Sequence, residues 1–125
     1  MSKPCWRPGC AGGRIGELGT GAGIGAGWVA SAVPADCVLI TVEIDELLAR
    51  AARELLAADS RVEVITGDAF RVIPSRGPFG LLFADSGVRD PSDFAALVSR
   101  PSCWREGRGH PAAVRCRRRP RGARR

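Results

Sequence analysis

The stretch RIGELGTGAGIGA, residues 14–26, decides the fold, because it carries a short apolar strand through a glycine-rich turn and into a helix. Gly19, Gly21 and Gly23 permit positive φ angles and let a ligand approach the main chain closely. The start of the helix presents free N–H groups beside them. Residues 21–26 also satisfy the dinucleotide pattern G-x-G-x-x-A, so the turn alone leaves nicotinamide cofactors and other nucleosides open.

Short apolar runs alternate with helical patterns over residues 14–100. The run CVLITVE is nearly all apolar and rich in β-branched residues, which is typical of a strand covered on both faces. We expect Asp45 to cap a helix, Trp28 to lie in the core, and Pro34 and Pro74 to end the helices before them. Strands are predicted at residues 14–18, 37–43, 61–66 and 80–84, and helices at 23–33, 45–58, 68–73 and from Ser92 or Asp93 to 99.

Strands that alternate with helices in this way predict an α/β fold with a parallel sheet and right-handed crossovers. The flanking segments do not continue the pattern. Residues 1–13 are rich in proline and glycine and are expected to form an irregular arm. Residues 101–125 are rich in arginine, and Val114 is their only large aliphatic residue, so this tail is expected to be disordered.

The charge is unevenly distributed along the chain. Residues 1–100 hold ten basic and twelve acidic side chains, whereas residues 101–125 hold nine arginines and one acid, which together give the net charge of +6. Such a tail would attract phosphate backbones, so non-specific nucleic-acid binding is one functional alternative. No apolar run reaches the roughly 18–20 residues of a membrane span, and five cysteines at unpatterned spacings argue against a secreted disulfide framework. We therefore expect a cytoplasmic protein without membrane contact.

Four carboxylates stand where successive predicted strands end: Glu17, Glu43, Asp68 and Asp85. Ligands of open α/β sheets bind at that carboxyl edge, where an acid in the position of Glu43 can accept both hydroxyls of a ribose. Asp68 could instead be an ordinary helix cap. Four nearby carboxylates would repel a pyrophosphate, so the predicted pocket suits a cationic ligand better.

The segments RIGELGTGAGIGAGWVA, VLITVEID, RVEVITGDA and FGLLFADSG, in this order, resemble the class I S-adenosylmethionine (SAM)-dependent methyltransferases. They are most similar to the small-molecule O-methyltransferases related to catechol and caffeoyl-CoA methyltransferases. The resemblance implies a Rossmann-like doubly wound parallel sheet over residues 14–100, with strand order 3-2-1-4 and the later strands missing. It also implies methyl transfer from SAM to the hydroxyl oxygen of a small molecule.

The resemblance also carries a set of cofactor contacts over to this sequence. The set consists of Glu17, Gly19 and Gly21 around the methionine part, Glu43 at the ribose, Asp68 with Ala69 at the adenine, and Thr20, Ile44 and Asp85 as further cofactor-binding residues.

The sequence departs from that family after the fourth strand. The metal-dependent branch has an acid there, which Asp85 matches, but also an Asp-Asn pair after a fifth strand, and no fifth strand is predicted. Val88 stands where a lysine base often stands. We therefore expect no divalent metal, assign no catalytic residue, and expect a truncated form with little or no turnover. The abrupt change in composition at Pro101 suggests a shifted reading frame, and copies could associate through the exposed edge of the fourth strand. An NAD(P)-binding Rossmann protein remains the alternative.

Overall fold

A five-stranded parallel sheet is the centre of the structure, a computed structural model that describes residues 13–84, 90–100 and 112–115. Its strands are β1 (Arg14–Leu18), β2 (Val38–Glu43), β3 (Val62–Thr66), β4 (Leu81–Ala84) and β5 (Ala112–Arg115). Its helices are α1 (Ile24–Ala32), α2 (Glu46–Leu56), α3 (Ala69–Arg76) and α4 (Pro91–Val98).

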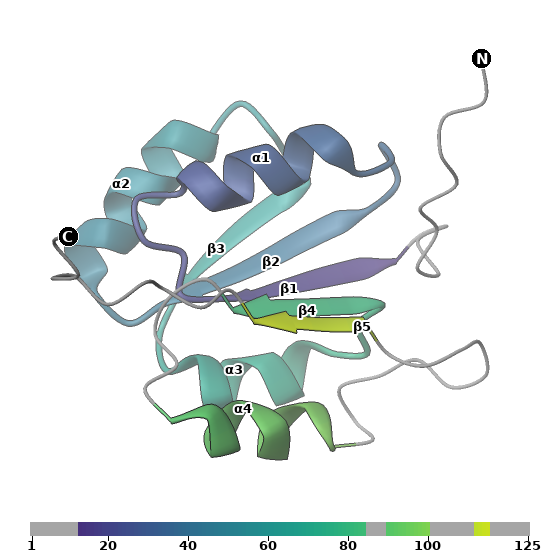
Figure 1. The fold of residues 1–125 in the computed structure, drawn as a ribbon. Coiled ribbons are helices and arrows are strands. Elements are labelled where there is room, and N and C mark those ends of the chain that lie inside the picture. Colours follow the sequence, from purple (N-terminus) through teal and green to yellow (C-terminus); the bar gives the residue numbers. More distant parts are fainter. Residues whose placement is uncertain (1–12, 85–89, 101–111, 116–125) are drawn as a thin grey trace, which may run out of the picture.

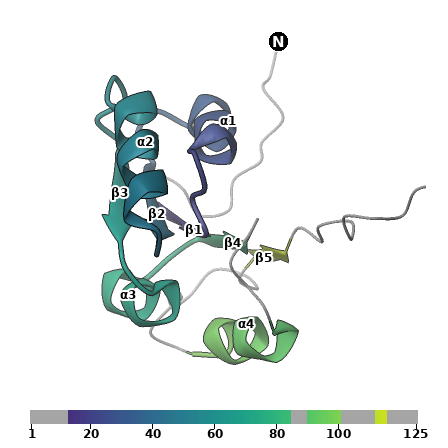
Figure 2. The same ribbon diagram turned by 90° about the vertical axis from the view of Figure 1, so that its left-hand side faces the viewer.

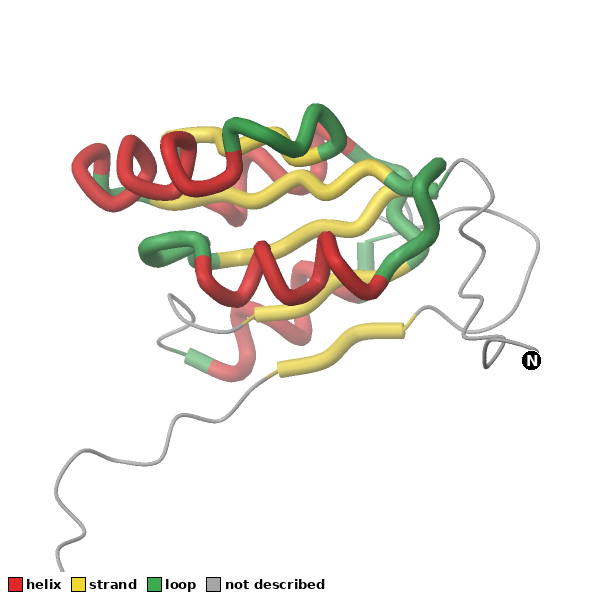
Figure 3. The backbone as a smooth tube through the Cα atoms, turned by 90° about the horizontal axis from the view of Figure 1, so that it is seen from above, coloured by secondary structure: helices red, strands yellow, loops and turns green. Residues whose placement is uncertain are grey.

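The strands lie in the order β3-β2-β1-β4-β5, so the predicted α/β class and the order 3-2-1-4 are confirmed. Helices α1 and α2 cover one face of the sheet, and α3 and α4 cover the other (Figures 1 and 2). Seen from above in Figure 3, the strands run side by side. Because all the strand pairs are parallel, the loops that follow the strands gather at one edge of the sheet.

Each face of the sheet has its own apolar core, because successive side chains of a strand point to opposite faces. Ile15 of β1 is in register with Leu39 of β2 and Leu81 of β4, and all three pack with Ala26, Ala30 and Leu56 under α1 and α2. The other core is formed by Leu18, Ile40, Val42, Ile73, Phe79, Leu82, Ala84, Phe94 and Leu97.

The sequence predicted that Trp28 lies in the core, and this prediction is wrong. Trp28 lies on the outer surface of α1, where 74% of it is exposed. Ala26 and Ala30 are the buried residues of this helix. Trp28 is two residues from each of them, about 200° around a helix of 3.6 residues per turn, and so points away from the sheet.

Helix α3 continues through Pro74, which was expected to end it. A proline inside a helix removes one backbone hydrogen bond. Here Ile73, which is fully buried, anchors the helix against the core. The side chain of Ser75 donates a hydrogen bond of 2.7 Å to Val72 O, and Arg14 Nη1 donates one of 2.6 Å to Arg76 O, so the end of the helix keeps partners beyond the proline.

Helix α4 begins at Pro91, slightly earlier than the predicted start at Ser92 or Asp93. Asp90 is its N-cap and accepts a hydrogen bond of 2.9 Å from Ser92 N, and this bonding lowers the pKa of Asp90. The first N–H groups of a helix have no partner inside the helix, and a proline at the first position has no N–H to leave unpaired, which explains why the helix can start there.

A fifth strand corrects part of the prediction that the later strands are missing, because the described residues contain one strand after β4. Strand β5 pairs with β4 in parallel, in the register Leu81 with Ala112 to Ala84 with Arg115. Its sequence, AAVR, is too short to give a recognisable strand pattern, but pairing with a neighbouring strand uses the backbone rather than the side chains. The edge of β4 is therefore covered, and the predicted association of copies through that exposed edge loses its basis. The rest of the predicted arm and tail lies outside the described residues.

Within the described ranges, no helix combines the length and the apolar character that crossing a membrane requires.

Candidate functional site

The loops after β1, β2 and β3 are joined by backbone hydrogen bonds at the carboxyl edge of the sheet. Gly19 N and Thr20 N donate to Val42 O, at 2.9 and 3.2 Å, and Gly67 N donates to Glu43 O at 2.9 Å. We call this region, residues 17–23, 41–45 and 67–69, the strand-end site. It contains every predicted cofactor contact except Asp85, which lies outside the described residues together with Val88.

The turn between β1 and α1 has the backbone that its glycines predicted. Gly19, Gly21 and Gly23 have φ angles of 84°, 57° and 93°, which residues other than glycine rarely adopt. A Cβ atom at Gly21 would meet no atom within 4 Å, so space is open over this residue, whereas one at Gly23 would lie 3.1 Å from Ala52 Cβ. Gly21 thus faces free space, and Gly23 brings the turn close to α2.

Glu17 is part of a buried polar network beneath the turn. Its register partner in β2 is Thr41, whose hydroxyl donates a hydrogen bond of 2.6 Å to Glu17 Oε1. The Thr41 hydroxyl is also 2.6 Å from that of Thr20. The exposed fractions of Glu17, Thr20 and Thr41 are 1%, 5% and 0%. Thr41 was not among the predicted site residues, although its hydroxyl inside the apolar run VLITVE was a signal, because a buried polar group needs a partner.

Glu43 joins the end of β2 to the turn after β1. Its Oε2 accepts a hydrogen bond of 2.8 Å from Gly21 N, and its Oε1 accepts one of 3.2 Å from Asp45 N. An ionised carboxylate has about four acceptor positions, so a ligand with two neighbouring hydroxyls can still bond to it. Ile44 follows with 75% of its surface exposed.

Asp68 lies at the end of β3 and caps α3, which is the alternative that the sequence left open. Its Oδ1 accepts a hydrogen bond of 2.9 Å from Phe70 N, and its Oδ2 is 4.0 Å from Arg71 Nε. Asp68 is exposed, and Ala69, the first residue of α3, is half-buried. The structure thus joins Glu17, Thr20, Thr41, Glu43 and Gly21 through direct contacts, and attaches Asp68 and Ala69 to them through the backbone.

A second ion pair lies at the other end of the helices and holds α1 in place. Arg61 pairs with Asp59 at 2.8 Å and also donates to Ala30 O and Pro34 O at the end of α1, at 2.7 and 3.0 Å. The hydrogen bonds from Arg61 lower the pKa of Asp59. This pair supports the helix rather than the strand-end site.

Among the described residues, no group of three or more histidine, cysteine, aspartate or glutamate side chains could hold a metal ion. Because Asp85 lies outside those residues, the expectation that the chain binds no divalent metal stays a prediction.

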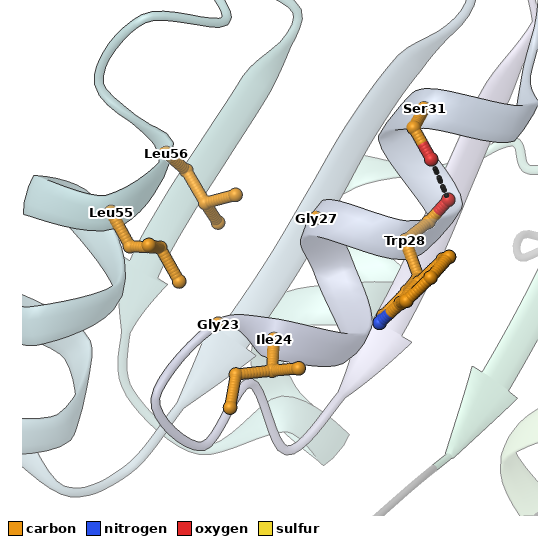
Figure 4. Close-up of a pocket in the computed structure, with 7 residues that line it drawn as sticks. All are labelled: Gly23, Ile24, Gly27, Trp28, Ser31, Leu55 and Leu56. Atoms are coloured by element: carbon orange, nitrogen blue, oxygen red, sulfur yellow. Dashed lines mark hydrogen bonds between the residues drawn. The ribbon is translucent and has the colours of Figure 1, made fainter.

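An apolar pocket of about 410 Å³ lies between α1 and α2 (Figure 4), and no acid of the strand-end site is among the residues that line it. Its walls include the exposed Trp28 and Leu55 and the buried Leu56. Gly23, at the start of α1, borders this pocket and ends the turn.

No protein-family model matches the sequence. A search of curated proteins finds a catechol O-methyltransferase of Niastella koreensis that is 33% identical over 103 residues, which cover 74% of this chain and 47% of that protein. The chain thus spans about half the length, or less, of the curated relatives that it matches.

Solved structures that resemble this chain also include O-methyltransferases. An O-methyltransferase of Streptomyces achromogenes involved in tomaymycin synthesis, solved in complex with SAM, is 30% identical with a TM-score of 0.59, over 67% of this chain and 41% of that one. A SAM-dependent O-methyltransferase of Thermotoga maritima is 26% identical with a TM-score of 0.56, over 69% of this chain and 32% of that one. The resemblance that the four sequence motifs indicated is therefore confirmed: over part of their length, this chain is similar in sequence and in fold to the SAM-dependent O-methyltransferases.

Proposed function

We propose that this chain binds SAM at the strand-end site and forms the cofactor-binding part of an O-methyltransferase whose acceptor is a hydroxyl group of a small molecule. The observation that carries the proposal is the contact of 2.8 Å between Gly21 N and Glu43 Oε2. It joins the two sequence motifs that a nucleoside would need, namely a glycine turn open to a ligand and a carboxylate for the ribose.

The residues of the strand-end site fit such a cofactor. Glu43 is held by two backbone N–H groups and retains acceptor positions for the two ribose hydroxyls. The space over Gly21 admits a ligand close to the main chain. Glu43 places a carboxylate at the turn, and a second carboxylate, that of Glu17, lies buried beneath the turn. This negative charge favours a ligand with a positive charge and disfavours the pyrophosphate of NAD.

The part of this chain in the reaction would be to bind and orient. SAM, when bound, would supply a methyl group on a positively charged sulfur; transfer of that group to the acceptor oxygen would leave the bonding electron pair on the sulfur, and the proton of the acceptor hydroxyl would pass to water. Held on Glu43 and against the turn, the cofactor would have a defined direction relative to the acceptor, and positioning of this kind lowers the barrier of a two-reactant step. No catalytic residue is assigned among the described residues.

Calorimetric titration tests the proposal. The chain is titrated with S-adenosylhomocysteine, the product form of the cofactor, and separately with NAD. We expect binding of S-adenosylhomocysteine and no comparable binding of NAD. Glu43→Gln should weaken the binding at least tenfold, because hydrogen bonds to a charged group contribute about 1.5–3 kcal/mol and 1.4 kcal/mol is tenfold. Glu54→Gln, which changes an exposed acid of α2, is the matched control and should bind like the wild type. Tighter binding of NAD would overturn the proposal.

We also infer a cytoplasmic location from the composition, because the sequence has no long apolar run. The nine arginines of residues 101–125 support non-specific binding of nucleic acid by that segment. Deletion of residues 116–125, which removes six arginines and leaves β5 in place, should strongly weaken any binding to a random-sequence oligonucleotide, and undiminished binding after the deletion would refute the role of this segment.

A further inference from the structure

Three buried side chains form one continuous line of hydrogen bonds under the glycine turn. Thr41 lies in the middle, 2.6 Å from Glu17 Oε1 on one side and 2.6 Å from the Thr20 hydroxyl on the other. Thr41 is wholly buried, and the two other residues are at most 5% exposed. Glu17 is in β1, Thr41 is in β2 and Thr20 is in the turn, so the line connects two strands with the loop between β1 and α1.

The direction of these hydrogen bonds follows from the chemistry of the hydroxyl group. A threonine hydroxyl has one hydrogen to donate and two lone pairs to accept with. Thr41 gives its hydrogen to Glu17. It must therefore accept from Thr20, whose hydroxyl hydrogen points down into the sheet. The carboxylate of Glu17 thus sets the orientation of a side chain in the turn through one intermediate group.

The turn needs external contacts to keep one shape, because its own residues restrict it little. Thr20 stands between Gly19 and Gly21, both with positive φ, and glycine loses the most conformational freedom when it is ordered. Strand β2 supplies four hydrogen bonds that tie these residues to the sheet: Val42 O accepts from Gly19 N and Thr20 N, Glu43 accepts from Gly21 N, and Thr41 contacts the Thr20 side chain. Of these, the contact of Thr41 is the one that also reaches Glu17.

We propose that Thr41 is a positioning residue, which holds Glu17 and Thr20 in one arrangement so that the glycine turn is preformed for its ligand. The identity of that ligand rests on the function proposed above, but the effect of Thr41 on the turn does not. Without the Thr41 hydroxyl the two outer groups lose their common partner, and the turn must be ordered when the ligand binds.

The variant that tests this is Thr41→Val, which keeps the branched shape and removes the hydroxyl, with Thr41→Ser as the conservative variant that restores it. Amide hydrogen exchange of the full chain, followed by NMR, gives a readout that needs no ligand. In Thr41→Val the amides of Gly19, Thr20 and Gly21 should exchange at least tenfold faster. The amides of Ala49 in α2 and Val72 in α3, which bond to Asp45 O and Asp68 O, should change much less. Thr41→Ser should stay within about threefold of the wild type.

The matched control is Thr66→Val, which removes the hydroxyl of an exposed threonine at the end of β3, where it contacts Arg53 at 2.6 Å. It should leave the exchange of the turn unchanged. If Thr41→Val does not fold, Thr20→Val removes the same contact from the side of the loop and should speed exchange of the turn in the same way.

Calorimetry of the same variants separates this inference from the proposed function. If the wild type binds S-adenosylhomocysteine, Thr41→Val should bind it at least tenfold more weakly, and Thr41→Ser should restore the affinity. If the wild type binds none, the proposed function fails, and the exchange data still decide whether Thr41 holds the turn. The inference is overturned if Thr41→Val speeds exchange in the turn no more than in α2 and α3, or if Thr41→Ser is as damaging as Thr41→Val.

Discussion

Gly21 donates its backbone N–H to Glu43 Oε2 at 2.8 Å, so the carboxylate that ends β2 is bonded to the turn that follows β1. Two motifs that are 22 residues apart in sequence thereby form one site. Because the contact uses a backbone N–H, it requires a particular backbone conformation at Gly21 rather than a particular side chain.

Substitution of that glycine should therefore destabilise the protein without a steric clash. Gly21 has φ of 57°, and a Cβ atom there would meet nothing within 4 Å. Gly21→Ala is expected to lower the free energy of unfolding by roughly 1–2 kcal/mol, the cost of the left-handed conformation for an L-residue. The control is Gly27→Ala inside α1, where the new Cβ would lie 3.7 Å from Leu56 Cδ2, an ordinary contact. It should stabilise the helix by about 0.5–1 kcal/mol. Urea denaturation measures both, and equal effects would contradict the account.

Gly16 is needed for a different reason, because the core leaves no space for a side chain. A Cβ atom at this position of β1 would lie 2.5 Å from Leu82 Cδ2 and 3.1 Å from Phe79 Cε1, both in fully buried side chains. Overpacking of this kind typically costs about 1–3 kcal/mol. Gly16→Ala should lose that much in urea denaturation, and Leu82→Val should recover part of it in the double variant. Strictly additive losses would show that the two residues do not compete for the same space.

The ion pair of Asp59 and Arg61 should make stability depend on pH in the acid range. Hydrogen bonds from Arg61 hold the pKa of Asp59 below its ordinary value of 3.8. A group with a lowered pKa in the folded state stabilises the protein above its unfolded pKa, and this contribution is lost as the pH falls through the folded pKa. The difference in the free energy of unfolding between the wild type and Asp59→Asn should therefore become smaller as the pH is lowered from 5 toward 2. A difference that stays constant in denaturation curves over this range would exclude the linkage.

Trp28 should contribute little to the free energy of unfolding, because it is exposed and does not lie in the core as expected. With 74% of it exposed, Trp28→Ala is expected to change the free energy of unfolding by less than about 1 kcal/mol. Phe79→Ala, at an aromatic residue that is 1% exposed, should cost about 3–5 kcal/mol. A large loss for Trp28→Ala would show that the apolar pocket beside it is closed by other parts of the chain in solution.

The sequence predicted the elements whose signals are local. The apolar run of β2, the cap at Asp45 and the glycines of the turn each determine their own conformation, and the structure contains all three. The strand order 3-2-1-4 followed from the motifs of the resembling family and is confirmed.

The predictions that were wrong concern features that depend on contacts between distant segments. Strand β5 exists because β4 offers a free edge, and its four residues carry no pattern of their own. Helix α3 passes Pro74 because Ile73 is held by the core, which outweighs one lost hydrogen bond. Thr41 could not be placed beside Glu17 without the register between β1 and β2, and the sequence does not give that register.

The proposed function requires that the adenosyl cofactor binds at the contact between Gly21 and Glu43. NMR titration of the full chain with S-adenosylhomocysteine tests it most directly, because the amides of Gly21 and Asp45 both donate to the carboxylate that would receive the ribose. We expect these two amide signals to shift with the concentration of the ligand, and Glu43→Gln to weaken the binding at least tenfold. Shifts confined to the pocket between α1 and α2, or no response of Gly21 to saturating ligand, would contradict it.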